Sequence, residues 1–253
     1  MDSGTYAAAS SGMAQIRKLD VVSNNLANVN TPGFKRQLLV REVQEFDQTL
    51  AKAQNLDQLA KDDIVRVAGV ANLRTQTDFS PGAIKNTGNT YDVALRNPND
   101  FFVVATPTGN QYTRAGNFTL NANGEIVTQD GFLVQGDGGP ITVNGPGASI
   151  SPAGIVRTAN GEVGRLQVVR FTDTEGLERT SAARFQVKAG QAGPAAVEAD
   201  VVPESLEMSN VSAISGVLDI IAANRAFQAY AKSAETIDSL NQAAISQVGK
   251  PRY

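Results

Sequence analysis

Both ends of the chain have apolar residues at the three- and four-residue spacing of an amphipathic helix. Residues 5–29 form one such stretch, and residues 211–248 form the other. Two helices of this kind can bury their apolar faces within one molecule only if they meet. The sequence therefore predicts that the two ends pair, and that everything between them is inserted between the arms of a helical pair.

The predicted terminal helices carry few charges. Only Arg17, Lys18 and Asp20 are charged within residues 5–29. Helices this rich in alanine and poor in charge are expected to be covered on more than one side. Other subunits are a natural source of that cover, and packing on the chain's own domain is the alternative. Ser209 and Asn210 are predicted to cap the second helix, because their side-chain oxygens can accept unpaired backbone N–H groups.

The middle of the chain has two further parts. Residues 35–80 predict a charged, solvated connector, with a short amphipathic helix over residues 43–57 and an extended run over residues 64–77. Residues 81–203 hold 17 of the 23 glycines between short runs of β-type residues. The expected strands are residues 100–105, 111–114, 118–120, 125–128, 132–134, 141–143, 166–171 and 184–187. Short strands between regular turn signals indicate an antiparallel β domain.

These patterns predict an α+β fold. Paired, coiled-coil-like N- and C-terminal helices bracket an inserted, mainly antiparallel β domain. The expected divisions are residues 1–34 for the N-terminal helix, 35–80 for the connector, 81–204 for the β domain and 205–253 for the C-terminal helix.

Several residue types are missing from the chain. It has no His, no Cys and no Trp, which excludes Ser-His-Asp and Cys-His catalysis, thiol redox chemistry and zinc sites built from His or Cys. The net charge of −3 does not suggest a nucleic-acid partner. No apolar run approaches the roughly 20 residues of a spanning helix, and the first residues do not resemble a general secretory signal peptide. We expect no cofactor, no metal, no small-molecule substrate and no membrane insertion.

An enzymatic alternative depends on carboxylates in the β domain. Paired aspartates could cleave a glycan, and the candidates are Asp92, Asp100, Asp130, Asp137 and Asp173. The simpler interpretation is that Asp130-Gly131 and Asp137-Gly138 are turn dipeptides. Calcium binding at such turns is a weaker alternative, because no spacing matches an EF-hand or a repeated calcium-binding loop.

Three asparagines stand close together where the first helix should end. Asn24 and Asn28 share a helix face, and Asn25 lies beside them. Asparagine is a poor interior helix former, so it can either end the helix or fix the register of a helix–helix contact. We favour the register role for Asn25 and Asn28. Pro32 and Gly33 then predict a sharp exit from the helix.

Five segments of the sequence are similar to motifs of one known family. They are VVSNNLANVNTPGFK (residues 21–35), TDFSPGAIKNTGN (77–89), YTRAGNF with GEIVTQDG (112–118 and 124–131), EMSNV (207–211) and NRAFQ (224–228). Together they resemble the bacterial flagellar rod and hook protein family, in the family's order and over nearly the whole chain. Residues 97–102 (NPNDFF) depart from the usual GDGFF, and Asn224 and Phe227 stand where Gln and Tyr are usual.

The resemblance implies a structural subunit and not an enzyme. It implies self-assembly into the hollow periplasmic rod that acts as the drive shaft, in its proximal segment, with the distal segment as the alternative. Such proteins leave through the flagellar type III export apparatus without a cleaved signal peptide, and their partners are that apparatus, other rod subunits and copies of themselves. Their terminal helices form an inner tube and the β domain forms an outer layer. The residues predicted to form the assembly interface are Met13, Ile16, Asn24, Asn25, Leu26, Asn28, Pro32, Gly33, Phe34, Ser209, Asn210, Val211, Ile214, Leu218, Ile221, Arg225, Phe227 and Ile237.

Overall fold

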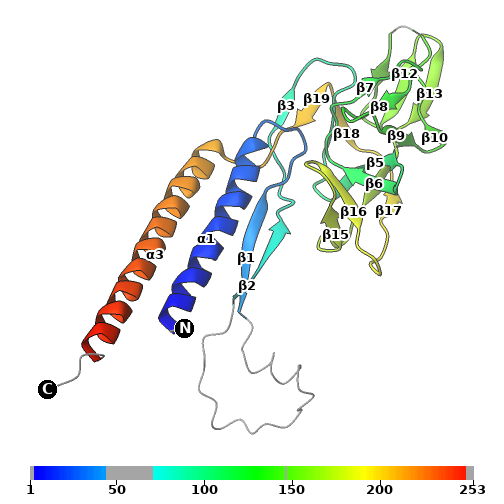
Figure 1. The fold of residues 1–253 in the computed structure, drawn as a ribbon. Coiled ribbons are helices and arrows are strands. Elements are labelled where there is room, and N and C mark those ends of the chain that lie inside the picture. The colour runs from blue at the N-terminus through cyan, green and yellow to red at the C-terminus, as the bar shows by residue number, and fades with distance from the viewer. Residues whose placement is uncertain (1–2, 44–70, 146, 249–253) are drawn as a thin grey trace, which may run out of the picture. The chain divides into compact units, whose positions relative to one another are not determined.

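The computed structural model describes residues 3–43, 71–145 and 147–248 (Figure 1). The chain divides into two compact units, which we describe separately. The helical unit comprises residues 1–23, 37–76 and 217–253, and the β unit comprises residues 24–36 and 77–216. The structure is thus α+β with mainly antiparallel sheets and a helix near each end, as predicted.

Two long helices dominate the helical unit. Helix α1 is Ser3–Ala27 and helix α3 is Ala213–Val248. They contact each other, because a Cβ atom built on Gly12 of α1 would lie 3.9 Å from the ring of Phe227 on α3. The long periodic segments are therefore correctly predicted as helices. Their association as a coiled coil stays a prediction.

Part of the predicted connector is a small sheet. Strands β1 (Gln37–Val43) and β2 (Ala71–Thr77) pair as a two-stranded sheet in the helical unit. Residues 37–43 of the predicted connector form a strand that was not predicted, and residues 37–40 of it are partly buried or exposed. The extended run is confirmed at residues 71–77. The amphipathic helix predicted over residues 43–57 lies almost wholly outside the described residues.

The β unit is built from short strands, all paired antiparallel. They are β3 (Ile84–Asn86), β4 (Val93–Leu95), β5 (Asp100–Thr106), β6 (Gly109–Thr113), β7 (Thr119–Leu120), β8 (Ile126–Val127), β9 (Leu133–Gly136), β10 (Gly139–Pro140), β11 (Ser149–Ile150), β12 (Ile155–Thr158), β13 (Gly161–Arg165), β14 (Val168–Arg170), β15 (Leu177–Arg179), β16 (Arg184–Val187), β17 (Ala195–Val197), β18 (Val201–Pro203) and β19 (Ser205–Glu207). The main sheet has the order β15-β16-β6-β5-β9-β8-β7, and β14 also pairs with β5. Smaller sheets join β11-β12-β13, β18-β4 and β19-β3.

The hairpins fall close to their predicted places. β5 pairs with β6 up to Thr106 and Gly109, so the turn is shorter than the four residues predicted. β7 pairs with β8 as predicted. The strand predicted at residues 141–143 is wrong, because Thr142 forms only an isolated bridge to Glu125. Ile141 and Val143 are nevertheless buried. The apolar-polar-apolar pattern of residues 141–143 therefore reflects the burial of two side chains. It does not reflect the regular backbone pairing of a β-strand.

Strand β5 separates two apolar cores. Phe102 and Val104 belong to the larger cluster, whereas Phe101 and Val103 belong to the smaller one. Successive side chains of a strand point to opposite faces, so both faces of β5 are buried. This explains why its sequence is continuously apolar instead of alternating with polar residues.

Helix α3 begins later than predicted. Its first residue is Ala213, and the backbone N–H of Ser215 donates to Ser212 Oγ at 3.4 Å. Ser212 is therefore the capping residue, and the prediction that Ser209 and Asn210 cap this helix is wrong. Ser209 Oγ accepts from the N–H of Val211, and Asn210 belongs to a network in the β unit.

Candidate functional site

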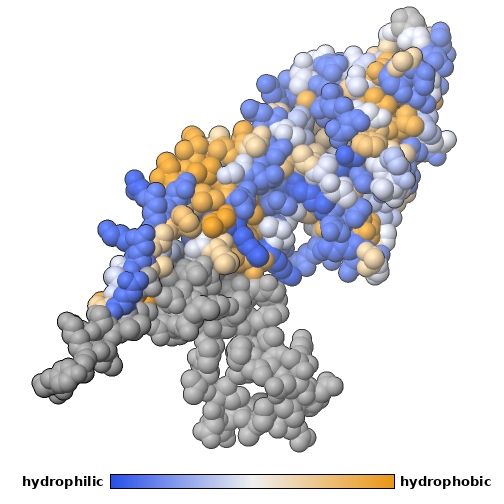
Figure 2. All heavy atoms as spheres, in the orientation of Figure 1, coloured by the Kyte–Doolittle hydropathy of each residue, from blue (hydrophilic) through white to orange (hydrophobic). Residues whose placement is uncertain are grey.

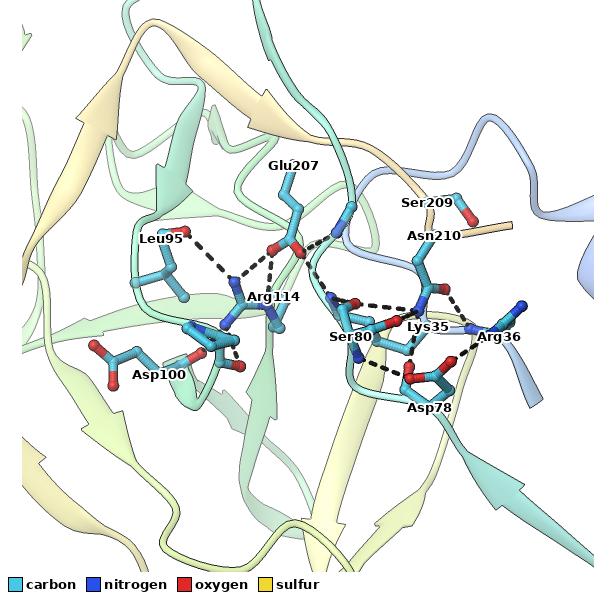
Figure 3. A network of polar contacts seen from close by, with 12 residues as sticks. Lys35, Arg36, Asp78, Ser80, Leu95, Asp100, Arg114, Glu207, Ser209 and Asn210 are labelled. Atoms are coloured by element: carbon cyan, nitrogen blue, oxygen red, sulfur yellow. Dashed lines mark hydrogen bonds and ion pairs between the residues drawn. The ribbon is translucent and has the colours of Figure 1, made fainter. Parts of the chain in front are cut away.

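Segments far apart in the sequence meet around Glu207 in the β unit (Figure 3). Glu207 ends β19, and its side chain faces Lys35, which follows the exit from α1, and Arg114, which follows β6. We call Lys35, Arg114 and Glu207 the buried ionic cluster. The exposed fraction of each side chain is at most 1%.

Both oxygens of the Glu207 carboxylate are occupied. Lys35 Nζ donates to Oε1 at 2.6 Å, and the backbone N–H of Gly82 donates to the same oxygen at 3.0 Å. Arg114 Nε donates to Oε2 at 2.7 Å, and a terminal nitrogen of Arg114 lies 2.6 Å from that oxygen. Lys35 Nζ also donates to the carbonyl oxygen of Ser80 at 2.7 Å. A charged group can be buried at tolerable cost only when it is paired in this way.

The Arg114 guanidinium also organises the loop that departs from the family motif. It donates to the carbonyl oxygens of Asn97, Pro98 and Asp100 at 2.7–2.9 Å. The Asp100 carboxylate in turn accepts two hydrogen bonds from Arg170. The carbonyl oxygens of this loop thus bind Arg114, the second cation of the cluster. The Asp100 carboxylate of the same loop pairs with Arg170 instead.

Burial and the three charges of the cluster, two positive and one negative, together set its pKa shifts. Burial lowers the pKa of Lys35; attraction to Glu207 opposes the shift, and repulsion by Arg114 adds to it. Burial alone would raise the pKa of Glu207, but Arg114 and Lys35 together outweigh it, so that pKa is lowered. Burial therefore sets the direction of the shift at Lys35, and the two neighbouring cations set it at Glu207.

A second, more exposed layer of polar contacts surrounds Asn210. The backbone N–H of Arg36 donates to Asn210 Oδ1 at 2.7 Å, and Asn210 Nδ2 donates to the carbonyl oxygens of Asp78 and Ser80 at 2.9 and 3.1 Å. Arg36 Nε donates to the Asp78 carboxylate at 2.8 Å. One asparagine thus connects the segment before α3 to the two segments that flank the β1-β2 sheet in the sequence.

Two glycines of the similar segments permit close approaches beside the cluster. Gly33 has φ of +67°, and a Cβ atom on it would lie 2.3 Å from the backbone nitrogen of Ala115. The N–H of Gly33 donates to the backbone oxygen of Glu207 at 2.7 Å. A Cβ on Gly82 would lie 1.8 Å from the backbone oxygen of Met208. No other residue fits at either position without a backbone shift.

The side chain of Asn28 ends helix α1. Its Nδ2 donates to the carbonyl oxygen of Asn24 at 2.8 Å, and its Oδ1 accepts from Thr31 Oγ1 at 3.2 Å. The Asn24 carbonyl oxygen also accepts from the backbone N–H of Asn28 at 3.3 Å, so the side chain adds a second hydrogen bond at the helix end. Asn28 therefore has a capping role, the alternative to the role that we favoured. Asn25 is buried and Asn24 is exposed. A register role for these asparagines stays a prediction.

The other predicted interface residues differ in their exposure to solvent. The exposed fraction is 66% for Met13, 78% for Ile214 and 61% for Leu218, and Ile16 and Ile221 are also exposed. Figure 2 shows apolar side chains gathered over the N-terminal half of α3. Arg225 is exposed; Leu26, Pro32, Ser209, Asn210, Val211, Phe227 and Ile237 are partly buried; Gly33 and Phe34 are buried.

A cavity of about 160 Å³ lies between the two helices of the helical unit. Its lining residues are Gly12, Met13 and Ile16 of α1 with Phe227, Tyr230, Ala231 and Ala234 of α3. We call this cavity the interhelical groove. Four of the seven lining residues were not among the predicted interface residues. Small residues at helical spacing could have indicated Gly12, Ala231 and Ala234, and the apolar periodicity of the second helix could have indicated Tyr230.

The carboxylates of the enzymatic alternative have ordinary structural partners. Asp100 pairs with Arg170, and Asp130 pairs with Arg184 at 3.2 Å. Asp92 accepts from Thr87 Oγ1 at 2.6 Å and from Asn89 Nδ2 at 2.9 Å. Among the described residues there is no group of three or more side chains suited to hold a metal ion.

Comparison with known proteins identifies the class of chain to which this arrangement belongs. Residues 6–35 match the family model described as "Flagella basal body rod protein", residues 97–161 match "Flagellar hook protein FlgE/F/G D1 domain", and residues 202–247 match "Flagellar basal body rod FlgEFG protein C-terminal". Each matched segment contributes one member of the buried ionic cluster. Within the described residues, no helix is long and apolar enough to cross a membrane.

Individual relatives match over almost their whole length. The chain is 34% identical to the flagellar basal-body rod protein FlgF of Caulobacter vibrioides, over 99% of both chains. It is 34% identical to FlgG of the same organism, over 93% of this chain and 95% of that one. It is 31% identical to FlgG of Bacillus subtilis, over 93% and 96%. The chain belongs to the family of flagellar basal-body rod proteins.

Proposed function

We propose that this chain is a structural subunit of the proximal segment of the flagellar basal-body rod. In this role it assembles with copies of itself and with other rod components into the hollow drive shaft. The observation that carries the structural role is the exposure of large apolar side chains on α1 and α3, of which Met13, Ile214 and Leu218 are the most exposed of those predicted at the interface. Contiguous apolar surface of this kind marks a protein–protein contact.

The match to FlgF supports the proximal segment. That relative and this chain cover each other over 99% of their lengths, whereas the FlgG relatives leave several per cent of this chain unmatched at similar identity. The distal segment is the second candidate, because those FlgG proteins are nearly as similar. An enzymatic function has no support from the family.

The remaining parts of the proposal concern arrangement and location. The terminal helices pair as a coiled-coil-like inner layer, and the β unit forms the outer layer. The chain works in the periplasmic part of the basal body and leaves the cytoplasm through the flagellar type III apparatus without a cleaved signal peptide.

Deletion and complementation test this function. A strain that lacks the gene should assemble no complete rod and should not swim, and the wild-type gene should restore both. Cryo-electron microscopy of isolated basal bodies should then show density for this chain in the proximal segment. Normal rods in the deletion strain would refute a structural role, and density only in the distal segment would favour the second candidate.

A further inference from the structure

Three Asn-Gly dipeptides lie in the β unit. They are Asn123-Gly124, Asn144-Gly145 and Asn160-Gly161. All three asparagines are exposed. Glycine has no Cβ to obstruct its own backbone nitrogen, so in each dipeptide that nitrogen can approach the side-chain amide carbon of the preceding asparagine. Each asparagine is therefore chemically able to lose its amide group, and the surrounding contacts decide which of them does.

The reaction needs only the dipeptide and water. The glycine N–H gives its proton to water or hydroxide, and the nitrogen forms a bond with the asparagine Cγ. The bond from Cγ to the amide nitrogen breaks, and ammonia leaves with a proton from water. Water then opens the resulting succinimide ring at either carbonyl, which leaves aspartate or isoaspartate. In sum, one amide and one water become one carboxylate and one ammonium ion, without an oxidant or a cofactor.

Backbone contacts hold Gly124 in place. Its N–H donates to the carbonyl oxygen of Asn121 at 3.0 Å, and its carbonyl oxygen accepts from the N–H of Val143 at 2.7 Å. The N–H of Asn123 donates to Asn121 Oδ1 at 2.9 Å. The nitrogen of Gly124 can lose its proton and turn toward the Asn123 side chain only after its hydrogen bond has opened. The fold therefore protects Asn123.

The dipeptide Asn160-Gly161 is held in another way. It lies in the turn between β12 and β13, and Gly161 pairs with Thr158 where the two strands meet. The N–H of Asn160 donates to Thr158 Oγ1 at 3.3 Å, and Asn160 Nδ2 donates to the carbonyl oxygen of Asn144 at 3.5 Å. The amide group that would leave is thus itself bonded, and the attacking nitrogen belongs to a strand. The fold therefore protects Asn160 as well.

The dipeptide Asn144-Gly145 has neither kind of restraint. Both residues are exposed and lie outside the strands. Within the described part of the chain, neither the Asn144 side chain nor the Gly145 N–H has a hydrogen-bond partner. The contact from Asn160 reaches only the backbone oxygen of Asn144. We infer that Asn144 is a site of spontaneous deamidation in the folded protein, and that it converts faster than Asn123 and Asn160.

Conversion changes this corner of the β unit. It adds one negative charge, and isoaspartate also inserts an extra carbon atom into the main chain beside the contact with Asn160. That contact has little spare room, because a Cβ atom built on Gly145 would lie 3.0 Å from Asn160 Nδ2. Hydrolysis does not restore the amide, so the converted fraction increases with the age of the molecule. The inference concerns the folded β unit and does not depend on the proposed role in the rod.

Peptide mass spectrometry of the ageing full-length protein tests this site. Cleavage after Arg114, Glu125, Arg157 and Glu162 places each of the three asparagines in a separate peptide. Samples are taken over time at neutral pH, and a sample at time zero corrects for conversion during digestion. The Asn144 peptide should accumulate the acid about two- to tenfold faster than the other two, which is the ratio that one net hydrogen bond corresponds to. Aspartate and isoaspartate forms have the same mass and are separated by chromatography.

The protein unfolded in guanidinium chloride is the control for sequence effects. There the three rates should approach one another, because the contacts that protect Asn123 and Asn160 are lost. The same ratio in the folded and unfolded chain would show that sequence alone sets the order and would refute the inference. Equal rates in the folded protein, or an Asn144 that converts only when the chain is unfolded, would overturn it too.

Two variants connect the chemistry to the intact protein. Asn144→Gln keeps an amide at this exposed position but requires a larger ring, so it should abolish the acidic band that isoelectric focusing of the aged wild-type protein resolves. Asn123→Gln is the matched control at another exposed asparagine of an Asn-Gly pair, and it should keep that band. An acidic band of wild-type intensity in Asn144→Gln, or its loss in Asn123→Gln, would assign the modification elsewhere and contradict the proposal.

Discussion

Replacing Glu207 with Gln should strongly destabilise the β unit. The substitution keeps the shape of the side chain but removes the single negative charge of the buried ionic cluster. Lys35 and Arg114 would then stay buried without a counterion, and the new amide group would point a donor at other donors. Removal of one partner from a buried ion pair costs about 3–5 kcal/mol. We expect the Glu207→Gln variant to lose an amount in that range from the free energy of unfolding.

Removing Lys35 should cost less than removing Glu207. Lys35→Met leaves Glu207 paired with Arg114, at 2.6 Å, and brings the cluster to neutrality. Its main loss is the hydrogen bond to Ser80, with an expected cost of about 1–2 kcal/mol. Asp200→Asn is a matched control, because it removes a carboxylate from an ion pair with Arg96 in which both side chains are about 60% exposed. Such pairs contribute about 1 kcal/mol or less.

Urea unfolding of the purified protein measures these differences. The chain has no tryptophan, so near-ultraviolet circular dichroism of the tyrosines and phenylalanines reports the packing of the β unit. A loss of about 3–5 kcal/mol corresponds to a midpoint shift of roughly 1–3 M urea. A Glu207→Gln variant as stable as the Asp200→Asn control would refute the argument that the single anion is essential to the cluster. A Lys35→Met variant that loses as much as Glu207→Gln would refute the argument that one of the two cations costs less to remove.

Four further predictions follow from the same contacts. The pKa of Glu207 lies below its ordinary value of 4.5. The stability that the Glu207 carboxylate contributes should therefore be complete above pH 4.5 and should be lost as pH falls through the lower pKa of the folded state. Between pH 7 and pH 3, the urea midpoint should fall less in Glu207→Gln than in the wild type. Gly33→Ala should cost at least about 1–2 kcal/mol from its left-handed φ alone, whereas Gly138→Ala, with open space around it, should be nearly neutral in thermal unfolding. Asn28→Ala should lose about 1 kcal/mol of capping and speed amide exchange at the end of α1; unchanged exchange with impaired assembly would instead favour the register role. In the monomer, amide exchange should be fast in residues 3–23 and 217–248, the helical segments of the helical unit, and slow across residues 85–190; equal protection of both would contradict the dependence of the helices on neighbours.

Local patterns predict the parts of this fold that depend on neighbours in the sequence. The two helices follow from apolar spacing, and the β5-β6 and β7-β8 hairpins follow from β-type runs around turn residues. Such features are encoded within one or two dozen residues. The start of α3 was misplaced because Ser209, Asn210 and Ser212 are all good capping residues, and only the tertiary contacts of Asn210 decide among them.

The buried ionic cluster could not be predicted in this way. Lys35 stands next to Arg36 at the start of a charged stretch, and such a stretch predicts that both side chains are exposed to solvent. In the structure Lys35 is buried and Arg36 is exposed. Arg114 and Glu207 are separated by 93 residues, and no periodicity connects them. One signal was present: three of the segments similar to the family each contain one member of the cluster. Pairing them requires knowledge of the fold.

The position of Glu207 in the chain has a consequence for how the β unit folds. Glu207 lies 172 residues after Lys35, and β18 and β19 complete small sheets with β4 and β3. Contacts at such separation carry the entropic cost of a long loop and form slowly. During synthesis from the N-terminus, the two cations have no carboxylate partner in the cluster until residue 207 has been added. A chain interrupted before residue 201 lacks both strands and the anion, so its β unit stays open to proteases.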